Sequence, residues 1–208
     1  MRPITIHIAN VSGRLDAHLD VVVTAFESAT SLARGLLEAE GIDVLFLDAP
    51  DETIPEWGVG GYTYGPNVIL VALDPAAALE KEKIETTLVH EFHHAMRWRG
   101  PGCGGNLAQM LVSEGMAQLF EEEALGAAPF FSRVRITDDD VAQAQSALYA
   151  QPFSQQKWFF GADGITKAFG YTYGYQLSKA YALAMGKKAS ELIDVPADEV
   201  MGFSGPST

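Results

Sequence analysis

The pattern of apolar and polar positions divides the first 75 residues into a strand, a helix and two further strands. Residues 4–8 alternate between apolar and polar side chains, and residues 15–40 carry apolar side chains at helical spacing. Residues 42–47 and 68–73 are short apolar runs typical of strands, whereas residues 51–66 are rich in glycine and proline. We therefore expect a small sheet with a helix across it, and a loop over residues 51–66.

Beyond residue 75 the periodicity becomes mainly helical. The predicted helices cover residues 82–99, 107–125, 138–149 and 171–185. Residues 129–135 are expected to be irregular, residues 153–160 to be a partly buried aromatic connection, and the tail beyond residue 185 to be weakly held. The fold class is therefore α+β. We expect a single domain over residues 1–208, with an N-terminal α/β part to about residue 75 and a mainly helical part over about residues 76–208.

Composition and charge narrow the class of protein. No apolar run approaches the roughly 18 residues of a membrane span, and the N-terminus lacks the apolar core of a secretory signal. The single cysteine, Cys103, excludes an internal disulfide, so we expect a soluble, cytoplasmic protein. The net charge of -13 argues against a nucleic-acid or membrane partner. A peptide or protein substrate remains compatible, and the oligomeric state stays open.

The most informative stretch is residues 89–97, which contains the pattern H-E-x-x-H at His90, Glu91 and His94. On a helix, two histidines four positions apart present both imidazoles on one face, which suits one metal ion. Glu91 lies on the flank of that face, where its carboxylate can reach a metal-activated water without being a ligand. His93 lies on the opposite flank, and we assign it no ligand role.

A catalytic zinc ion usually takes a third protein ligand, and the next predicted helix supplies a candidate. Glu114 follows His94 by 20 positions, after a turn rich in glycine. The neighbouring Gly115 permits close packing of the helix backbone. We therefore expect one zinc ion per chain, held by His90, His94 and Glu114. The competing interpretation is that the histidines are ordinary structural residues, but it leaves the carboxylates near apolar sequence unexplained, since burying them without a partner is costly.

These motifs resemble the gluzincin metalloproteases, in which H-E-x-x-H is followed by a glutamate on the next helix. A closer resemblance is to a family of predicted zinc-dependent proteases formerly catalogued as a domain of unknown function. Four segments together carry this resemblance: residues 61–67, 90–97, 113–115 and 170–175. The resemblance runs from about residue 58 to residue 186. It implies a zincin-like fold, zinc as the metal and hydrolysis of peptide bonds. One departure is Gln118, which stands where gluzincins often have an acid that orients a histidine.

The resemblance also implies roles for individual residues. Zinc would acidify its bound water, and Glu91 would accept the proton during attack on the carbonyl carbon and pass it to the leaving amine. A second donor to the oxyanion is expected from Tyr175 or Tyr171, with a slight preference for Tyr175. The strand over residues 67–73 could line the cleft and pair with an extended substrate.

Three alternatives stay open at this point. The two tyrosines could belong to a helix that simply packs tightly through Gly170 and Gly174. The protein could be a non-catalytic interaction module stabilised by zinc, in which case Glu91 would have no function in hydrolysis. It could also be a metal hydrolase of a non-peptide amide or ester, because the zinc chemistry is shared.

Overall fold

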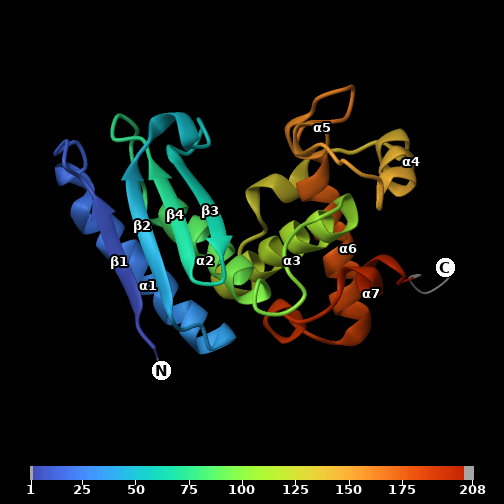
Figure 1. Cartoon of the computed structure of the whole chain (residues 1–208), viewed down its shortest axis with the longest axis horizontal. Coiled ribbons are helices and arrows are strands. Elements are labelled where there is room, and N and C mark those ends of the chain that lie inside the picture. The colour runs from blue at the N-terminus through green and yellow to red at the C-terminus, as the bar shows by residue number, and fades with distance from the viewer. Residues whose placement is uncertain (1, 204–208) are drawn as a thin grey trace. The chain divides into compact units, whose positions relative to one another are not determined.

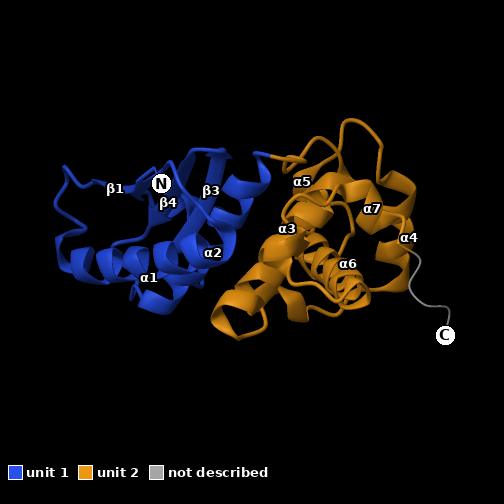
Figure 2. Cartoon of the chain, turned by 90° about the horizontal axis from the view of Figure 1, so that it is seen from below, with its two compact units in different colours: residues 1–99 blue, residues 100–208 orange. Residues whose placement is uncertain are grey.

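The computed structural model describes residues 2–203 and has an α+β fold. The chain divides into two compact units, Met1–Arg99 and Gly100–Thr208, drawn in different colours in Figure 2. The first unit contains the predicted α/β part and also the helix that carries the two histidines. The second unit is mainly helical. Each unit is described separately below.

The first unit is built on a four-stranded sheet with the order β1-β2-β4-β3. Its strands are β1 (Ile4–Ala9), β2 (Ile42–Asp48), β3 (Val59–Gly65) and β4 (Val68–Leu73). The first three strands in that order are parallel, and β3 is antiparallel to β4. Two helices, α1 (Leu19–Leu37) and α2 (Lys81–Arg97), lie on one face of this sheet (Figure 1). Short 3₁₀ turns follow β1 and β2, at Asp16–His18 and Pro50–Glu52.

The core of the first unit lies between the sheet and these helices. Alternate residues of β2 and β4 point into it and are fully buried, among them Val44, Phe46, Ile69 and Val71. The helix α2 buries Leu88 and Phe92 along its length. Burial of this face holds the histidine-bearing helix against the sheet, because α2 packs along β3 and β4.

The predicted loop over residues 51–66 is wrong in its second half, because residues 59–65 form the edge strand β3. Three glycines hide the strand signal in the sequence. Two of them are required by close packing: a Cβ at Gly60 would lie 2.2 Å from the carbonyl oxygen of Glu52, and one at Gly61 would lie 2.7 Å from Cγ of Glu91. Consequently β4, which was expected to pair with substrate, lies between β2 and β3 and is hydrogen-bonded on both sides.

The second unit is organised around two long helices, α3 (Leu107–Leu125) and α6 (Phe169–Met185), which pack along each other. The remaining elements are short: a 3₁₀ turn at Phe130–Arg133, α4 (Asp138–Ala147), α5 (Gln155–Phe160), a 3₁₀ turn at Ala189–Leu192 and α7 (Ala197–Met201). The side chain of Asn106 caps α3, and a capping box between Thr137 and Asp140 begins α4.

Two expectations for this unit need correction. The aromatic connection contains a helix, α5, in which Trp158 and Phe159 are buried and Phe160 is half exposed. The segment after residue 185 is ordered over residues 186–203, because Leu192 and Val200 are buried in a cluster against α3 and α6. Gly205 and Pro206, which were part of the expected weak tail, lie outside the described residues. Across residues 2–203, every helix is too short or too polar to cross a membrane.

Candidate metal centre

The two histidines of the H-E-x-x-H pattern converge on one side of α2. The Nε2 atoms of His90 and His94 are 2.9 Å apart, and the ring planes are inclined by 79°. His94 is buried and His90 is half-buried. Two nitrogens that bind one tetrahedral zinc ion at about 2.0–2.1 Å are separated by roughly 3.3 Å. The observed separation is close to that value, so the pair suits a shared metal ion.

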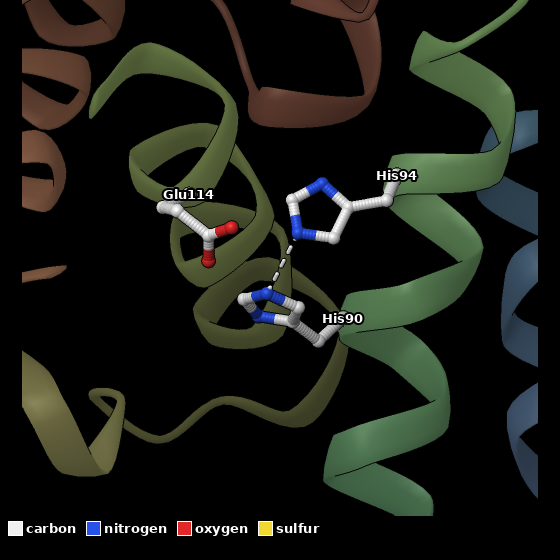
Figure 3. Close-up of side chains that lie close together, drawn as sticks. All are labelled: His90, His94 and Glu114. Carbon is white, nitrogen blue, oxygen red and sulfur yellow. Dashed lines mark hydrogen bonds between the residues drawn. The ribbon is translucent and has the colours of Figure 1, made fainter. Parts of the chain in front are cut away.

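The third predicted ligand, Glu114, lies on α3 and is half-buried. One ligand atom from each of His90, His94 and Glu114 lies within 4.8 Å of the others (Figure 3). Two imidazoles and one carboxylate are the donor set of many catalytic zinc sites, which keep a fourth position for water or substrate. The residues that the structure describes therefore fit a zinc ion.

Glu91 is buried beside the histidines and is held by the edge strand. Its carboxylate oxygen Oε2 accepts a hydrogen bond of 2.7 Å from the hydroxyl of Thr63 on β3. The same hydroxyl lies 2.9 Å from the backbone oxygen of Glu91. Sequence reasoning missed Thr63, because the two residues are 28 positions apart and nothing in the local pattern marks the pairing. Two signals were available in the sequence: the glycine at residue 61, and the resemblance of residues 61–67 to the family of predicted zinc-dependent proteases.

His93 and Gln118 are neighbours in sequence of the predicted ligands, on α2 and α3 respectively. The ring of His93 is fully buried, and its centroid lies 6.4 Å from that of the His94 ring. Gln118 is buried one turn after Glu114, and its amide nitrogen donates a hydrogen bond of 2.9 Å to the backbone oxygen of Tyr171. Its carbonyl oxygen is buried and has no hydrogen-bond partner within residues 2–203.

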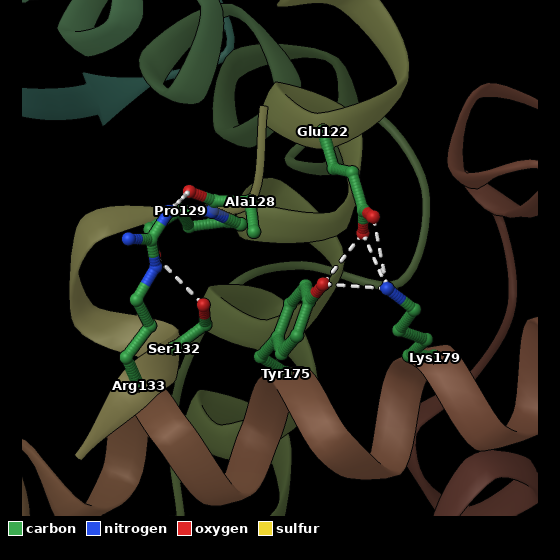
Figure 4. Close-up of polar contacts among 7 residues, drawn as sticks. All are labelled: Glu122, Ala128, Pro129, Ser132, Arg133, Tyr175 and Lys179. Carbon is green, nitrogen blue, oxygen red and sulfur yellow. Dashed lines mark hydrogen bonds and ion pairs between the residues drawn. The ribbon is translucent and has the colours of Figure 1, made fainter. Parts of the chain in front are cut away.

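The two candidate tyrosines lie in different surroundings on α6. The hydroxyl of Tyr175 donates a hydrogen bond of 2.5 Å to Oε2 of Glu122 on α3, and Nζ of Lys179 lies 2.8 Å from Tyr175 Oη (Figure 4). The ring of Tyr171 stacks on Phe131 with a centroid distance of 5.2 Å, and Phe159 meets it edge-on at 5.0 Å. Tyr171 is therefore placed by aromatic packing, and Tyr175 by a polar cluster.

The cluster of Glu122, Tyr175 and Lys179 is electrostatically coupled. Hydrogen bonds from Lys179, first, and from Tyr175 lower the pKa of Glu122. Burial, followed by the hydrogen bond to Glu122, raises the pKa of Tyr175. The Tyr175 hydroxyl is consequently kept protonated as a donor to Glu122. Lys179 follows Tyr175 by one helical turn, which is a recognisable spacing, but its partner on α3 was not predictable from sequence.

Comparison with known proteins places the chain in one family. No curated protein and no solved structure matches it. A family model matches residues 22–202, which include α2 with its two histidines, the edge strand β3 and the long helices α3 and α6. That span covers most of the 208 residues. The chain therefore belongs to the family described as "Predicted Zn-dependent protease (DUF2268)".

Proposed function

We propose that this protein is a zinc metallopeptidase that hydrolyses peptide bonds, with His90, His94 and Glu114 as the ligands of one zinc ion. The observation that carries the proposal is the convergence of His90 Nε2 and His94 Nε2 beside the buried carboxylate of Glu91. Burying a carboxylate costs free energy unless hydrogen bonds and a nearby cation compensate it, and Glu91 has the hydrogen bond from Thr63 while a zinc ion would supply the cation. Membership of the family supports the same conclusion.

The proposed reaction combines the chemistry of a bound zinc ion with proton transfer by Glu91. When bound, a zinc ion would polarise the scissile carbonyl as a Lewis acid and would lower the pKa of the attacking water. Glu91 accepts a proton from that water as it attacks the carbonyl carbon, and then donates the proton to the leaving amine nitrogen. The C–N bond breaks in this second step, so that water is divided between the new carboxyl and amino termini.

An extended peptide is the substrate that the edge of the sheet fits best. Within residues 2–203, β3 pairs with β4 along one edge, and its other edge is bridged only at Val59, to Ile54, so the rest of that edge retains backbone donors and acceptors. The strand also touches Glu91 through Thr63. We therefore propose that a substrate chain adds to β3, in place of the strand over residues 67–73 that the sequence suggested. Backbone pairing of this kind would hold the scissile bond near Glu91.

Digestion of a proteome-derived peptide library tests the function directly. Purified protein is expected to contain about one zinc per chain, to generate new peptide termini detectable by mass spectrometry, and to lose this activity on chelation. Restoring zinc should restore cleavage. If the loaded protein cleaves no peptide, a parallel panel of non-peptide amides and esters distinguishes another metal hydrolase from a non-catalytic module. For the module, chelation would lower thermal stability alone.

Substitution of one histidine is expected to empty the site. His94→Ala removes one of the converging nitrogens, so the zinc content measured by elemental analysis should fall well below one per chain. His7→Ala is the matched control, because His7 is an exposed residue of β1 that pairs with Asp43. It should leave the zinc content unchanged. Full zinc retention in His94→Ala would contradict the proposed ligand set.

Contacts within the second unit support Tyr171, rather than Tyr175, as the oxyanion donor. The Tyr175 hydroxyl already donates to Glu122, which lies eight residues, or about 12 Å along the helix axis, beyond Glu114 on α3. The backbone of Tyr171 instead contacts Gln118, one turn from Glu114. We expect Tyr171→Phe to lower kcat about 100-fold at similar KM.

Tyr175→Phe is the comparison for this prediction. It removes the hydroxyl that donates to Glu122, so it should mainly lower the free energy of unfolding, by about 1 kcal/mol. Peptidase assays and chemical denaturation of both variants separate the two effects. A loss of kcat in Tyr175→Phe alone would reverse the assignment.

A further inference from the structure

The edge strand β3 contacts the carboxylate of Glu91 through two residues that lie on the same face of the strand. Thr63 donates from its hydroxyl to Oε2 of Glu91. Gly61, two positions earlier, leaves the space that the carboxylate occupies, since a Cβ there would lie 2.7 Å from both Cγ and Oε1 of Glu91. The strand therefore meets the Glu91 side chain on both of its carboxylate oxygens.

This contact restricts the orientation of Glu91. A glutamate side chain has three rotatable bonds, and fixing them costs conformational entropy unless neighbours hold the group. Thr63 and Glu91 are buried to 8% and 6% exposure, so water competes little for their hydrogen bond. Thr63 Oγ1 also lies near the backbone oxygen of Glu91, which ties the strand to the helix at this residue. The carboxylate is thus held by the strand rather than by its own helix alone.

We infer that Thr63 is a positioning residue for Glu91, and that Gly61 provides the clearance this arrangement requires. The inference rests on the proposed function, in which Glu91 transfers the proton. Only Oε2 accepts from Thr63, which under this inference leaves Oε1 as the oxygen that accepts the proton of the reacting water. A general base must lie within hydrogen-bond reach of the proton that it accepts. Its position therefore affects the rate as well as its basicity, because misplacement by about 1 Å can slow the reaction substantially.

Two substitutions at residue 63 separate the hydroxyl from the shape of the side chain. Thr63→Val is nearly isosteric and removes the donor, and we expect it to lower kcat at least tenfold with little change in KM or zinc content. Thr63→Ser keeps the donor and should recover most of the lost kcat. Thr86→Val is the matched control, because the Thr86 hydroxyl donates to the backbone of the same helix at Glu82. It should leave kcat unchanged.

A stability measurement on metal-free protein tests the contact without any assay of activity. In a double-mutant cycle of Thr63→Val and Glu91→Leu, the double variant should lose less stability than the two single variants together, because removing both partners leaves neither group unsatisfied. A coupling equivalent to about a tenfold change in the unfolding equilibrium constant is expected.

The two readouts distinguish failure of this inference from failure of the proposed function. Additive single effects in the cycle, or a Thr63→Ser variant as slow as Thr63→Val, would overturn the positioning role. If the wild type hydrolyses no peptide but the cycle still shows coupling, the proposed peptidase function would be contradicted. The contact between Thr63 and Glu91 would remain established.

Discussion

Glu91→Gln is expected to lower kcat for peptide hydrolysis at least 100-fold and up to about 10,000-fold, the range typical of losing general acid–base catalysis. The substituted amide has the shape of the carboxylate but accepts no proton from water at neutral pH. Its carbonyl oxygen can still accept the hydrogen bond from Thr63, so the fold should remain intact. Because Glu91 is not among the proposed ligands, the zinc content should stay near one per chain.

Steady-state kinetics and elemental analysis of the same preparation check this result together. Glu82→Gln is the matched control, since Glu82 is an exposed acid in the first turn of the same helix. It should retain full activity. Hydrolysis that survives Glu91→Gln at the wild-type rate would mean that another group activates the water. A protein with bound zinc and no hydrolysis in either form would match the non-catalytic module.

Gly174→Ala is expected to lower the free energy of unfolding by about 2 kcal/mol or more. The backbones of helices α3 and α6 approach each other closely at Gly115 and Gly174. A Cβ at Gly174 would lie 2.2 Å from the backbone oxygen of Leu111, and one at Gly115 would lie 2.1 Å from the backbone oxygen of Gly174. Backbone atoms cannot rotate aside, so the helices must separate. This cost exceeds the roughly 1 kcal/mol by which alanine favours a helix over glycine.

Chemical denaturation of metal-free protein measures this loss. Gly35→Ala is the control of opposite sign, because Gly35 lies in the exposed last turns of α1 and an added Cβ would meet nothing within 4 Å. It should stabilise the protein by about 0.5–1 kcal/mol through helix propensity alone. Equal stability changes at residues 35 and 174 would show that the helix crossing tolerates a methyl group. Zinc affinity provides a further readout, because α3 carries Glu114.

The long periodic elements were predictable because their signals are local. The apolar spacing of residues 107–125 and the closing Gly126 gave the same helix that the structure has. The predicted helix over residues 138–149 likewise begins at the residue where α4 begins. The strand β3 was missed, because its glycines serve contacts with Glu52 and Glu91 that are distant in sequence. A glycine that is required by a contact with a residue distant in sequence is indistinguishable, from the local sequence, from a glycine that forms a turn.

The same distinction between local and long-range signals applies to the candidate site. The sequence indicated His90, Glu91 and His94 through their helical spacing, and Glu114 through its place on the following helix. The hydrogen bonds that join residues distant in sequence, in the candidate site and in the Glu122 cluster, were not predictable. Thr63 is 28 positions from Glu91, and Lys179 is 57 positions from Glu122. Hydrogen bonds of this kind depend on how strands and helices pack, so no local pattern encodes them.

The free edge of β3 also affects how the protein behaves in concentrated solution. Its sequence, VGGYTYG, contains no charged residue and no proline, which are the usual guards of an exposed strand. Tyr62 and Tyr64 are exposed on it, at 61% and 73%. An edge of this kind is a template for any extended chain, including another copy of the same strand. The net charge of -13 opposes that association, because like-charged molecules repel at low ionic strength. The acidity of the chain thus acts as colloidal protection for a strand whose edge is the proposed site of substrate pairing.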